Sequence, residues 1–303
     1  MAKLGDKLKQ ILVPMVTPFK RGSEDVDYTM AEKLVEHLIS KNFCDTIVVT
    51  GTTGEFNTLS YEERIELFKT VKSAANGRIP LVAGTGAAST REAVKLTQEA
   101  EKFGYDAAMI VGPYYCKPSQ EGIYKHYETI AKNTGIDIML YNIPIFTGMN
   151  IEPETVERLS RIKNIVGVKD EAGINPTQMT DYTNVTPKDF TIYNGDDIMI
   201  LCGLVQGASG VVSGASHIIG DRIRKMINLF MGGKVAEARE IHMEIDPLFK
   251  AFCPNGRVNP MPVLRAAIEL AGLPVGPGRL PLDEATSEEK ENIRKHLLRL
   301  GVI

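Results

Sequence analysis

Lys169 is the residue whose place in the sequence points most directly to chemistry. It ends Ile165–Lys169, a short run rich in β-branched apolar residues that is typical of a buried parallel strand. Burial disfavours the charged ammonium and favours the neutral amine, which is the form that reacts with a ketone to give a Schiff base. A lysine at a strand end can also extend into solvent and do no chemistry. The residues around Lys169 must distinguish these two interpretations.

Two threonines follow another predicted strand. Thr52 and Thr53 lie within Gly51-Thr52-Thr53-Gly54-Glu55. Hydroxyl and backbone N–H groups near a helix start would suit a small carboxylate. The same residues could instead cap a helix after a tight turn, so the segment alone leaves both roles open.

Reactive side chains on separate strands need a scaffold that brings the strand ends together. Short apolar runs alternate with longer amphipathic segments along most of the chain. The predicted strands are Ile11–Thr17, Thr46–Thr50, Pro80–Ala83, Ala107–Val111, Ile138–Tyr141, Ile165–Lys169, Phe190–Asn194 and Gly210–Ser213. The predicted helices between them are Tyr28–Lys41, Ser60–Ala75, Ser89–Phe103, Gln120–Thr134, Pro153–Arg161, Thr177–Val185 and Asp197–Val205. Successive strand–helix units in this number predict an α/β fold, a (β/α)8 TIM barrel.

Strand signals stop near residue 220. The segments that follow are helical in pattern: Asp221–Met231, Lys234–Phe252, Met261–Ala271 and Ser287–Leu300. We therefore predict a catalytic barrel over residues 1–220 and a C-terminal helical extension over residues 221–303.

In such a barrel the fifth and sixth strands are neighbours, so Tyr141 and Lys169 should end side by side at the catalytic rim. Alternation along the strand places Ile165, Gly167 and Lys169 on the inner face. We expect Gly167 to leave room for a small ligand beneath the lysine. A tyrosine hydroxyl beside a reactive lysine can transfer protons while the Schiff base forms. Asp170 should point away from Lys169.

Composition narrows the possible functions. The chain has 303 residues, is 24% charged and carries a formal net charge of −3, which gives no sign of a nucleic-acid or membrane partner. No apolar run approaches the roughly 18 residues of a membrane span. The four cysteines are widely spaced and no histidines are paired at metal-binding spacing, so we predict no metal site. A mixed-charge N-terminus without a signal-peptide core predicts a cytoplasmic protein.

Two functions from other classes have some support in the sequence. Gly84-Thr85-Gly86 follows a strand and opens a helix, as in a nicotinamide oxidoreductase, but the third glycine of that motif is absent. A non-catalytic barrel that senses a keto acid is the other alternative. It would be expected to lack the Lys169 and Tyr141 pair, and both residues are present.

Taken in order along nearly the whole chain, the motifs resemble those of the dihydrodipicolinate synthase / N-acetylneuraminate lyase superfamily of pyruvate-dependent class I aldolases. The resemblance rests on six segments: G-T-T-G-E at 51–55, P-Y-Y at 113–115, Y-N-I-P at 141–144, G-V-K-D at 167–170, N-G-D-D at 194–197 and N-P-M-P-V at 259–263. It implies a lyase or synthase that joins pyruvate to an aldehyde or cleaves the product. It also implies that no cofactor is needed, because the substrate binds covalently to the enzyme, and that the enzyme is a homotetramer, a dimer of dimers.

The resemblance assigns roles to matching residues. Lys169 would form the imine with pyruvate, and Tyr141 would give and take the proton. Thr52 and Thr53 would hold the pyruvate carboxylate. Thr52 and Tyr115 would complete a hydroxyl relay, with Tyr115 supplied by the neighbouring subunit. Gly195 and Val212 would line the pocket through their backbone.

Phe146 departs from the synthase pattern. Typical dihydrodipicolinate synthases carry an arginine at this position, which binds the carboxylate of aspartate semialdehyde. Phenylalanine cannot make that bidentate contact. An apolar residue here is similar to the branches that cleave sialic acid or 2-keto-3-deoxy sugar acids. Two acceptors therefore stay open: aspartate semialdehyde, as in a 4-hydroxy-tetrahydrodipicolinate synthase, or a hydroxy-aldehyde released from a keto-deoxy sugar acid of the gluconate or N-acetylneuraminate type.

The site through which lysine inhibits many synthases is also altered. Tyr114 and Glu92 match that site, whereas Ala88 stands where asparagine is typical. The other altered positions are Phe56, Asn57, Tyr61 and Arg64. We predict that lysine inhibits this protein weakly or not at all.

Overall fold

The computed structural model describes residues 3–171, 173, 175–256 and 258–303. Its centre is a closed barrel in which each parallel strand pairs with the next and the last pairs with the first. The strands are β1 (Ile11–Pro14), β2 (Thr46–Val49), β3 (Leu81–Gly84), β4 (Ala107–Val111), β5 (Ile138–Asn142), β6 (Ile165–Asp170), β7 (Thr191–Asn194) and β8 (Gly210–Val212). The prediction of a (β/α)8 barrel with C-terminal helices is confirmed.

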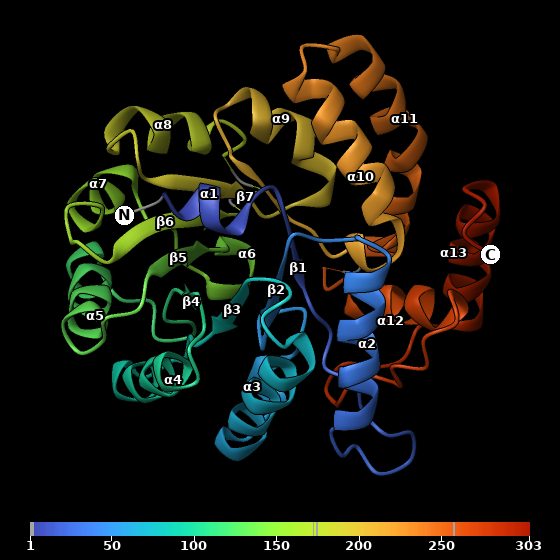
Figure 1. Ribbon diagram of the computed structural model, residues 1–303, viewed down its shortest axis with the longest axis horizontal. Helices are drawn as coiled ribbons and strands as arrows, with labels where there is room; N and C mark the ends of the chain where they lie inside the picture. Colours follow the sequence, from blue (N-terminus) through green and yellow to red (C-terminus); the bar gives the residue numbers. More distant parts are fainter. Residues whose placement is uncertain (1–2, 172, 174, 257) are drawn as a thin grey trace.

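Amphipathic helices surround the strands (Figure 1). Those of the barrel region are α1 (Leu4–Leu8), α2 (Tyr28–Ser40), α3 (Tyr61–Ala75), α4 (Thr90–Lys102), α5 (Gln120–Lys132), α6 (Pro144–Thr147), α7 (Pro153–Leu159), α8 (Gln178–Val185), α9 (Ile200–Val205) and α10 (Ser216–Met231). The α1 and α6 helices were not predicted. The short 3₁₀ helices are η1 (Phe56–Thr58), η2 (Asp197–Met199) and η3 (Pro254–Gly256).

Helix α1 closes the barrel at the N-terminal ends of the strands. Its Leu4 and Leu8 join the apolar cluster inside the barrel, and the Gly5 N–H donates to Thr191 Oγ1 over 3.0 Å. A Cβ at Gly167 would lie 2.6 Å from the Thr191 carbonyl oxygen and 3.0 Å from Leu4. The prediction that Gly167 makes room for a ligand is therefore wrong, because β7 and α1 fill that space.

Strict alternation along β6 fails at its start. Ile138 of β5 pairs with Ile165, but the next residue, Met139, pairs with Gly167. Val166 is an extra residue, a β-bulge, and it packs against the interior cluster while Ile165 joins the outer core. The predicted inward position of Ile165 is therefore wrong. Alternation resumes after the bulge and places Lys169 on the inner face.

The C-terminal helices α11 (Val235–Ala251), α12 (Met261–Leu270) and α13 (Ser287–Arg299) gather on the side of the barrel formed by α2 and α10 (Figure 1). Residue 220, where we predicted the barrel to end, lies inside α10. The division into a barrel and an extension stays a prediction.

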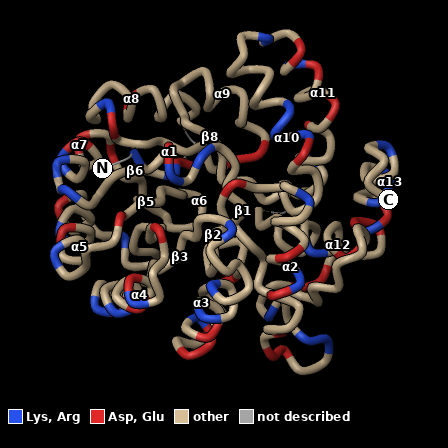
Figure 2. The backbone as a smooth tube through the Cα atoms, viewed as in Figure 1, with Lys and Arg blue, Asp and Glu red and all other residues tan. Residues whose placement is uncertain are grey.

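Basic and acidic residues are interspersed along the outer helices (Figure 2). This mixture agrees with the small net charge of the sequence. Within the described residues, no helix is both long and apolar enough to span a membrane.

Candidate active site

Tyr141 and Lys169 lie opposite each other at the C-terminal ends of β5 and β6. Lys169 is 4% exposed and Tyr141 is 2% exposed, so both are enclosed by the barrel. The Lys169 Nζ atom lies over the Tyr141 ring, 3.9 Å from its centroid. The proximity predicted from neighbouring strand ends is therefore present in the structure.

Glu171, which the sequence analysis did not single out, joins these two residues. Its Oε2 atom lies 3.0 Å from Lys169 Nζ and accepts a hydrogen bond of 2.8 Å from the Tyr141 hydroxyl. Glu171 stands two positions after Lys169, and this spacing on a strand was the available signal. Because β6 ends at Asp170, Glu171 lies just beyond the strand, and strand alternation alone does not place its side chain.

Asp170 points away from the lysine, as expected. Its Oδ1 atom accepts hydrogen bonds from Asn142 and Gln178 over 3.0 and 3.1 Å. Gly195 is the glycine that gives Lys169 room, because a Cβ there would lie 2.6 Å from Lys169 Cε and 2.9 Å from Glu171 Cβ. A larger residue at position 195 would displace the reactive side chain.

A cavity of about 360 Å³ opens beside Lys169. Thr52 and Thr53 line it from the loop after β2, and Gly195 and Val212 line it from the ends of β7 and β8. The Thr52 hydroxyl lies 3.5 Å from the Tyr141 hydroxyl, at the long limit of a hydrogen bond. Among the residues predicted for the pyruvate end, these four all line the same pocket as Lys169.

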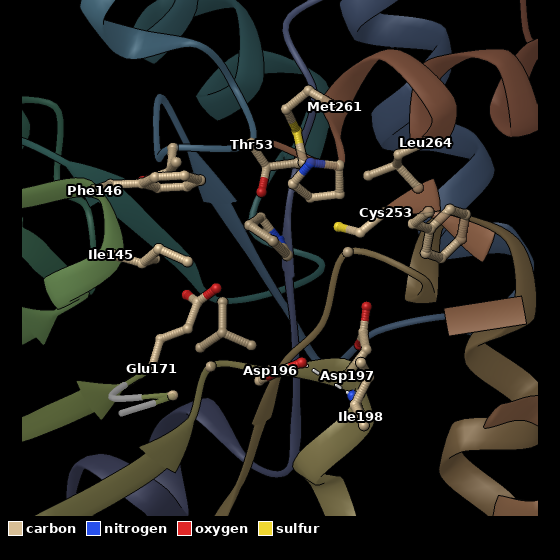
Figure 3. Close-up of a pocket in the computed structure, with 18 of the residues that line it drawn as sticks. Thr53, Ile145, Phe146, Glu171, Asp196, Asp197, Ile198, Cys253, Met261 and Leu264 are labelled. Atoms are coloured by element: carbon tan, nitrogen blue, oxygen red, sulfur yellow. Dashed lines mark hydrogen bonds between the residues drawn. The ribbon is translucent and has the colours of Figure 1, made fainter. Parts of the chain in front are cut away.

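Apolar side chains occupy the outer part of the pocket. Ile145 and Phe146 project from α6 and are 64% and 37% exposed. Cys253, Met261 and Leu264, from the C-terminal helices and the segment between them, lie across the pocket from Ile145 (Figure 3). The predicted contact of Phe146 with the pocket is thus present, and the C-terminal helices contribute to the wall.

Comparison with known proteins agrees with this site. Residues 7–300 match the model of the dihydrodipicolinate synthetase family. The chain belongs to this family. It is 47% identical to the 4-hydroxy-tetrahydrodipicolinate synthase of Desulforudis audaxviator, over 94% of this chain and 95% of that protein. It is 44% identical to the enzyme of the same name from Oceanobacillus iheyensis, over 95% and 96% of the two chains.

A solved structure supports the same assignment. The chain superimposes on a dihydrodipicolinate synthase from Cyanidioschyzon merolae with lysine bound, with a TM-score of 0.93, 41% identity and coverage of 98% and 99% of the two chains. The family named from the motifs is confirmed, and with it the prediction of a lyase or synthase of the pyruvate-dependent aldolase class.

Burial raises the pKa of three acidic groups at this site, the Glu171 and Asp197 carboxyls and the Tyr141 hydroxyl. Burial raises the pKa of the Glu171 carboxyl; Lys169 opposes the shift and Asp196 adds to it. Burial raises the pKa of Asp197 to about 6. Burial also raises the pKa of the Tyr141 hydroxyl well above its usual value, and the Glu171 charge raises it further. A proton on any of these groups is therefore held more strongly than at the surface.

Tyr115 lies apart from these residues within one chain. It is 91% exposed, on the loop after β4, and its φ angle is 69°. Its neighbour Tyr114 instead packs edge-on against Phe56, with the ring centroids 5.8 Å apart. The predicted relay through a partner's Tyr115 stays a prediction.

The described residues hold no group of three or more His, Cys, Asp or Glu side chains arranged to bind a metal. The prediction that the enzyme needs neither metal nor cofactor stays a prediction.

Proposed function

We propose that Lys169 forms a Schiff base with pyruvate and that the resulting enamine adds to aspartate semialdehyde, the reaction of a 4-hydroxy-tetrahydrodipicolinate synthase. The observation that carries the chemistry is the enclosed Lys169 amine beside the Tyr141 hydroxyl, in a pocket lined by hydroxyl groups. The choice of acceptor follows the names of relatives at 44–47% identity over most of the chain.

Each pocket residue has a part in this proposal. The Thr52 and Thr53 hydroxyls, which line the pocket, hold the pyruvate carboxylate. Tyr141 transfers protons as the carbinolamine loses water. Loss of a proton from the methyl group of the bound pyruvate then gives the enamine nucleophile. The substrate itself becomes the electron sink, so this chemistry needs no cofactor.

A specific observation favours a second acceptor. Phe146 and Ile145 present apolar surface where the synthase pattern has a carboxylate-binding arginine. This surface supports a hydroxy-aldehyde acceptor, and hence cleavage of a 2-keto-3-deoxy sugar acid or an N-acetylneuraminate-like substrate.

A panel of aldehydes distinguishes the two candidates. The enzyme is mixed with pyruvate and, in turn, with aspartate semialdehyde, glyceraldehyde and N-acetylmannosamine, and pyruvate consumption is measured. Fastest consumption with aspartate semialdehyde supports the first proposal, and fastest consumption with a hydroxy-aldehyde supports the second. No consumption with any aldehyde contradicts both.

We also propose a homotetramer located in the cytosol. Two exposed side chains, Tyr115 on the loop after β4 and Ile145 on α6, support a subunit contact. Cys44, Cys116 and Cys202 form no disulfide, which supports a reducing compartment. Sedimentation velocity tests the homotetramer. A monomer at micromolar protein concentration would contradict it. Fractionation of the source cells tests the cytosolic location.

A further inference from the structure

Glu171 makes a contact that a residue of purely structural role would not need. One oxygen, Oε2, touches both Lys169 Nζ and the Tyr141 hydroxyl, at 3.0 and 2.8 Å. The Glu171 side chain is 27% exposed and that of Lys169 is 5% exposed, and both line the pocket. The two groups that must exchange protons during imine formation therefore share a single acceptor atom.

The alternative partner of Tyr141 is more distant. The Thr52 hydroxyl is 3.5 Å from Tyr141, which is 0.7 Å longer than the Glu171 contact at 2.8 Å. Hydrogen bonds to charged oxygens are also the stronger ones. Within one chain, the shortest proton path from Tyr141 leads to Glu171.

Resting on the proposed imine chemistry, we propose that Glu171 is a catalytic residue that carries protons from the Lys169 nitrogen to Tyr141 and on to the departing oxygen of pyruvate.

The proton balance of this route closes. Glu171 first takes a proton from the Lys169 ammonium, and the electron pair left on nitrogen attacks C2 of pyruvate. The C=O π pair moves to oxygen, which gains a proton from Tyr141 while Glu171 replaces the proton on Tyr141. Glu171 then takes a second proton from nitrogen and passes it by the same path to the hydroxyl. Water leaves, the C=N bond forms, and Glu171 is again a carboxylate.

The surroundings of Glu171 suit this role. The groups that face it are Lys169 on β6, Tyr141 on β5, and Asp196 and Asp197 on the segment after β7. Burial and the nearby Asp196 charge raise the pKa of the carboxyl, which makes Glu171 a stronger base than a surface glutamate. The Lys169 ammonium opposes this shift and lies 3.0 Å from the Glu171 carboxylate, so the proton that Glu171 must accept is within reach.

The test measures the rate of imine formation, without any aldehyde. Parent enzyme and variants are mixed with pyruvate, quenched with borohydride after increasing times, and weighed as intact proteins. We expect Glu171→Gln to form the adduct about 100-fold more slowly, the lower range for loss of a general acid–base group. The final adduct fraction should remain similar, because a relay accelerates formation and hydrolysis alike. Glu171→Asp keeps a carboxylate and should recover part of the rate.

Two controls separate the proposal from simpler roles. If Glu171 only stabilised the ammonium, Glu171→Gln would leave more neutral amine and would form the adduct as fast as the parent or faster; that result would overturn the proposal. Asp196→Asn removes a nearby charge that raises the pKa of Glu171 but leaves the Glu171 carboxylate in place, so we expect a loss of rate clearly smaller than that of Glu171→Gln. An Asp196→Asn loss equal to that of Glu171→Gln would indicate a general charge effect and would also overturn it.

Failure of the underlying chemistry is a separate result. If the parent enzyme forms no adduct, the imine proposal itself fails. Near-ultraviolet circular dichroism shows whether each variant is folded. If Glu171→Gln does not fold, the rate of adduct formation by Glu171→Asp tests the role of Glu171 instead.

Discussion

Two buried ion pairs in this barrel show how similar geometry can serve different ends. Lys169 and Glu171 meet at 3.0 Å at the pocket, and Arg265 and Glu55 meet at 2.6 Å where α12 packs on the barrel. The second pair is almost completely enclosed, with side chains 3% and 1% exposed. Glu171 is 27% exposed and faces a cavity. The difference lies in what surrounds each charge.

The Arg265 guanidinium has partners on every side. It donates to Glu55, to the Thr17 carbonyl and, over 3.4 Å, to the carbonyls of Val275 and Gly276. Arginine does not lose its proton in proteins, so this pair has no second state to adopt. It fastens the C-terminal helices to the loops after β1 and β2.

The Lys169 pair has the opposite properties. Lysine can give up a proton and act as a nucleophile, and the neighbouring cavity leaves space for a reaction partner. An ion pair with all its donors satisfied, such as that of Arg265, holds packed elements of the fold together. An ion pair with a neutral alternative and free volume can do chemistry.

The largest predicted effect on stability tests the structural pair. Arg265→Ala leaves Glu55 buried without its charge partner and should lower the free energy of unfolding by about 3–5 kcal/mol. Lys169→Met leaves Glu171 27% exposed and with a raised pKa, so the carboxyl can take up a proton and the free energy of unfolding should fall by less than in Arg265→Ala. Urea unfolding measures both. Equal losses would remove the distinction between the two pairs.

The next effect tests the proton path. Tyr141→Phe removes the hydroxyl between Thr52 and Glu171 and should lower kcat by about 100-fold or more, with a smaller change in KM for pyruvate. Steady-state kinetics measure both constants. A Tyr141→Phe enzyme with the parent kcat would exclude Tyr141 from the proton path.

A gain of function tests the apolar wall. Phe146→Arg supplies a guanidinium at the outer pocket, and a charge-assisted contact of about 1.5–3 kcal/mol should lower KM for aspartate semialdehyde by about 10-fold or more. Phe146→Leu is the matched control and should leave this KM unchanged. If Phe146→Arg weakens use of aspartate semialdehyde, the carboxylate binds elsewhere.

The smallest effect concerns Asp197. Burial raises its pKa from 3.8 to about 6, so the folded protein holds this proton at pH values where the unfolded chain has lost it. The stability from this group is therefore complete below pH 3.8 and decreases as the pH rises to about 6. Asp197→Asn should raise the unfolding free energy at pH 7.5 and leave it nearly unchanged at pH 4. Thermal unfolding at the two pH values checks the sign, and a destabilised variant at pH 7.5 contradicts it.

Much of the barrel could be predicted because its strands are short, β-branched and separated by strongly amphipathic helices. Neighbouring strand ends then placed Tyr141 beside Lys169 with no further information. The sequence could not predict α1, because five residues are too few to show a helical period. It could not predict the bulge at Val166 either, because strand pairing alone determines which residue is left over.

The two ion pairs show the same limit. Glu55 lies in the segment 51–55, which we predicted as a carboxylate-binding loop, yet its side chain points to an arginine 210 positions away. Only packing of α12 on the barrel brings the two together. Glu171 is two positions from its partner, but its role depends on how the chain turns after β6 ends. Contacts between strand neighbours follow from the pattern, whereas contacts made by loops depend on the complete fold.

Reductive trapping tests the central claim most directly. The enzyme is incubated with pyruvate, reduced with borohydride, digested and analysed by mass spectrometry. We predict one stable pyruvate-derived adduct per chain, located on Lys169, and no adduct in a folded Lys169→Ala variant. An adduct on another residue, or equal trapping by Lys169→Ala, would contradict the assignment of Lys169 as the reactive amine.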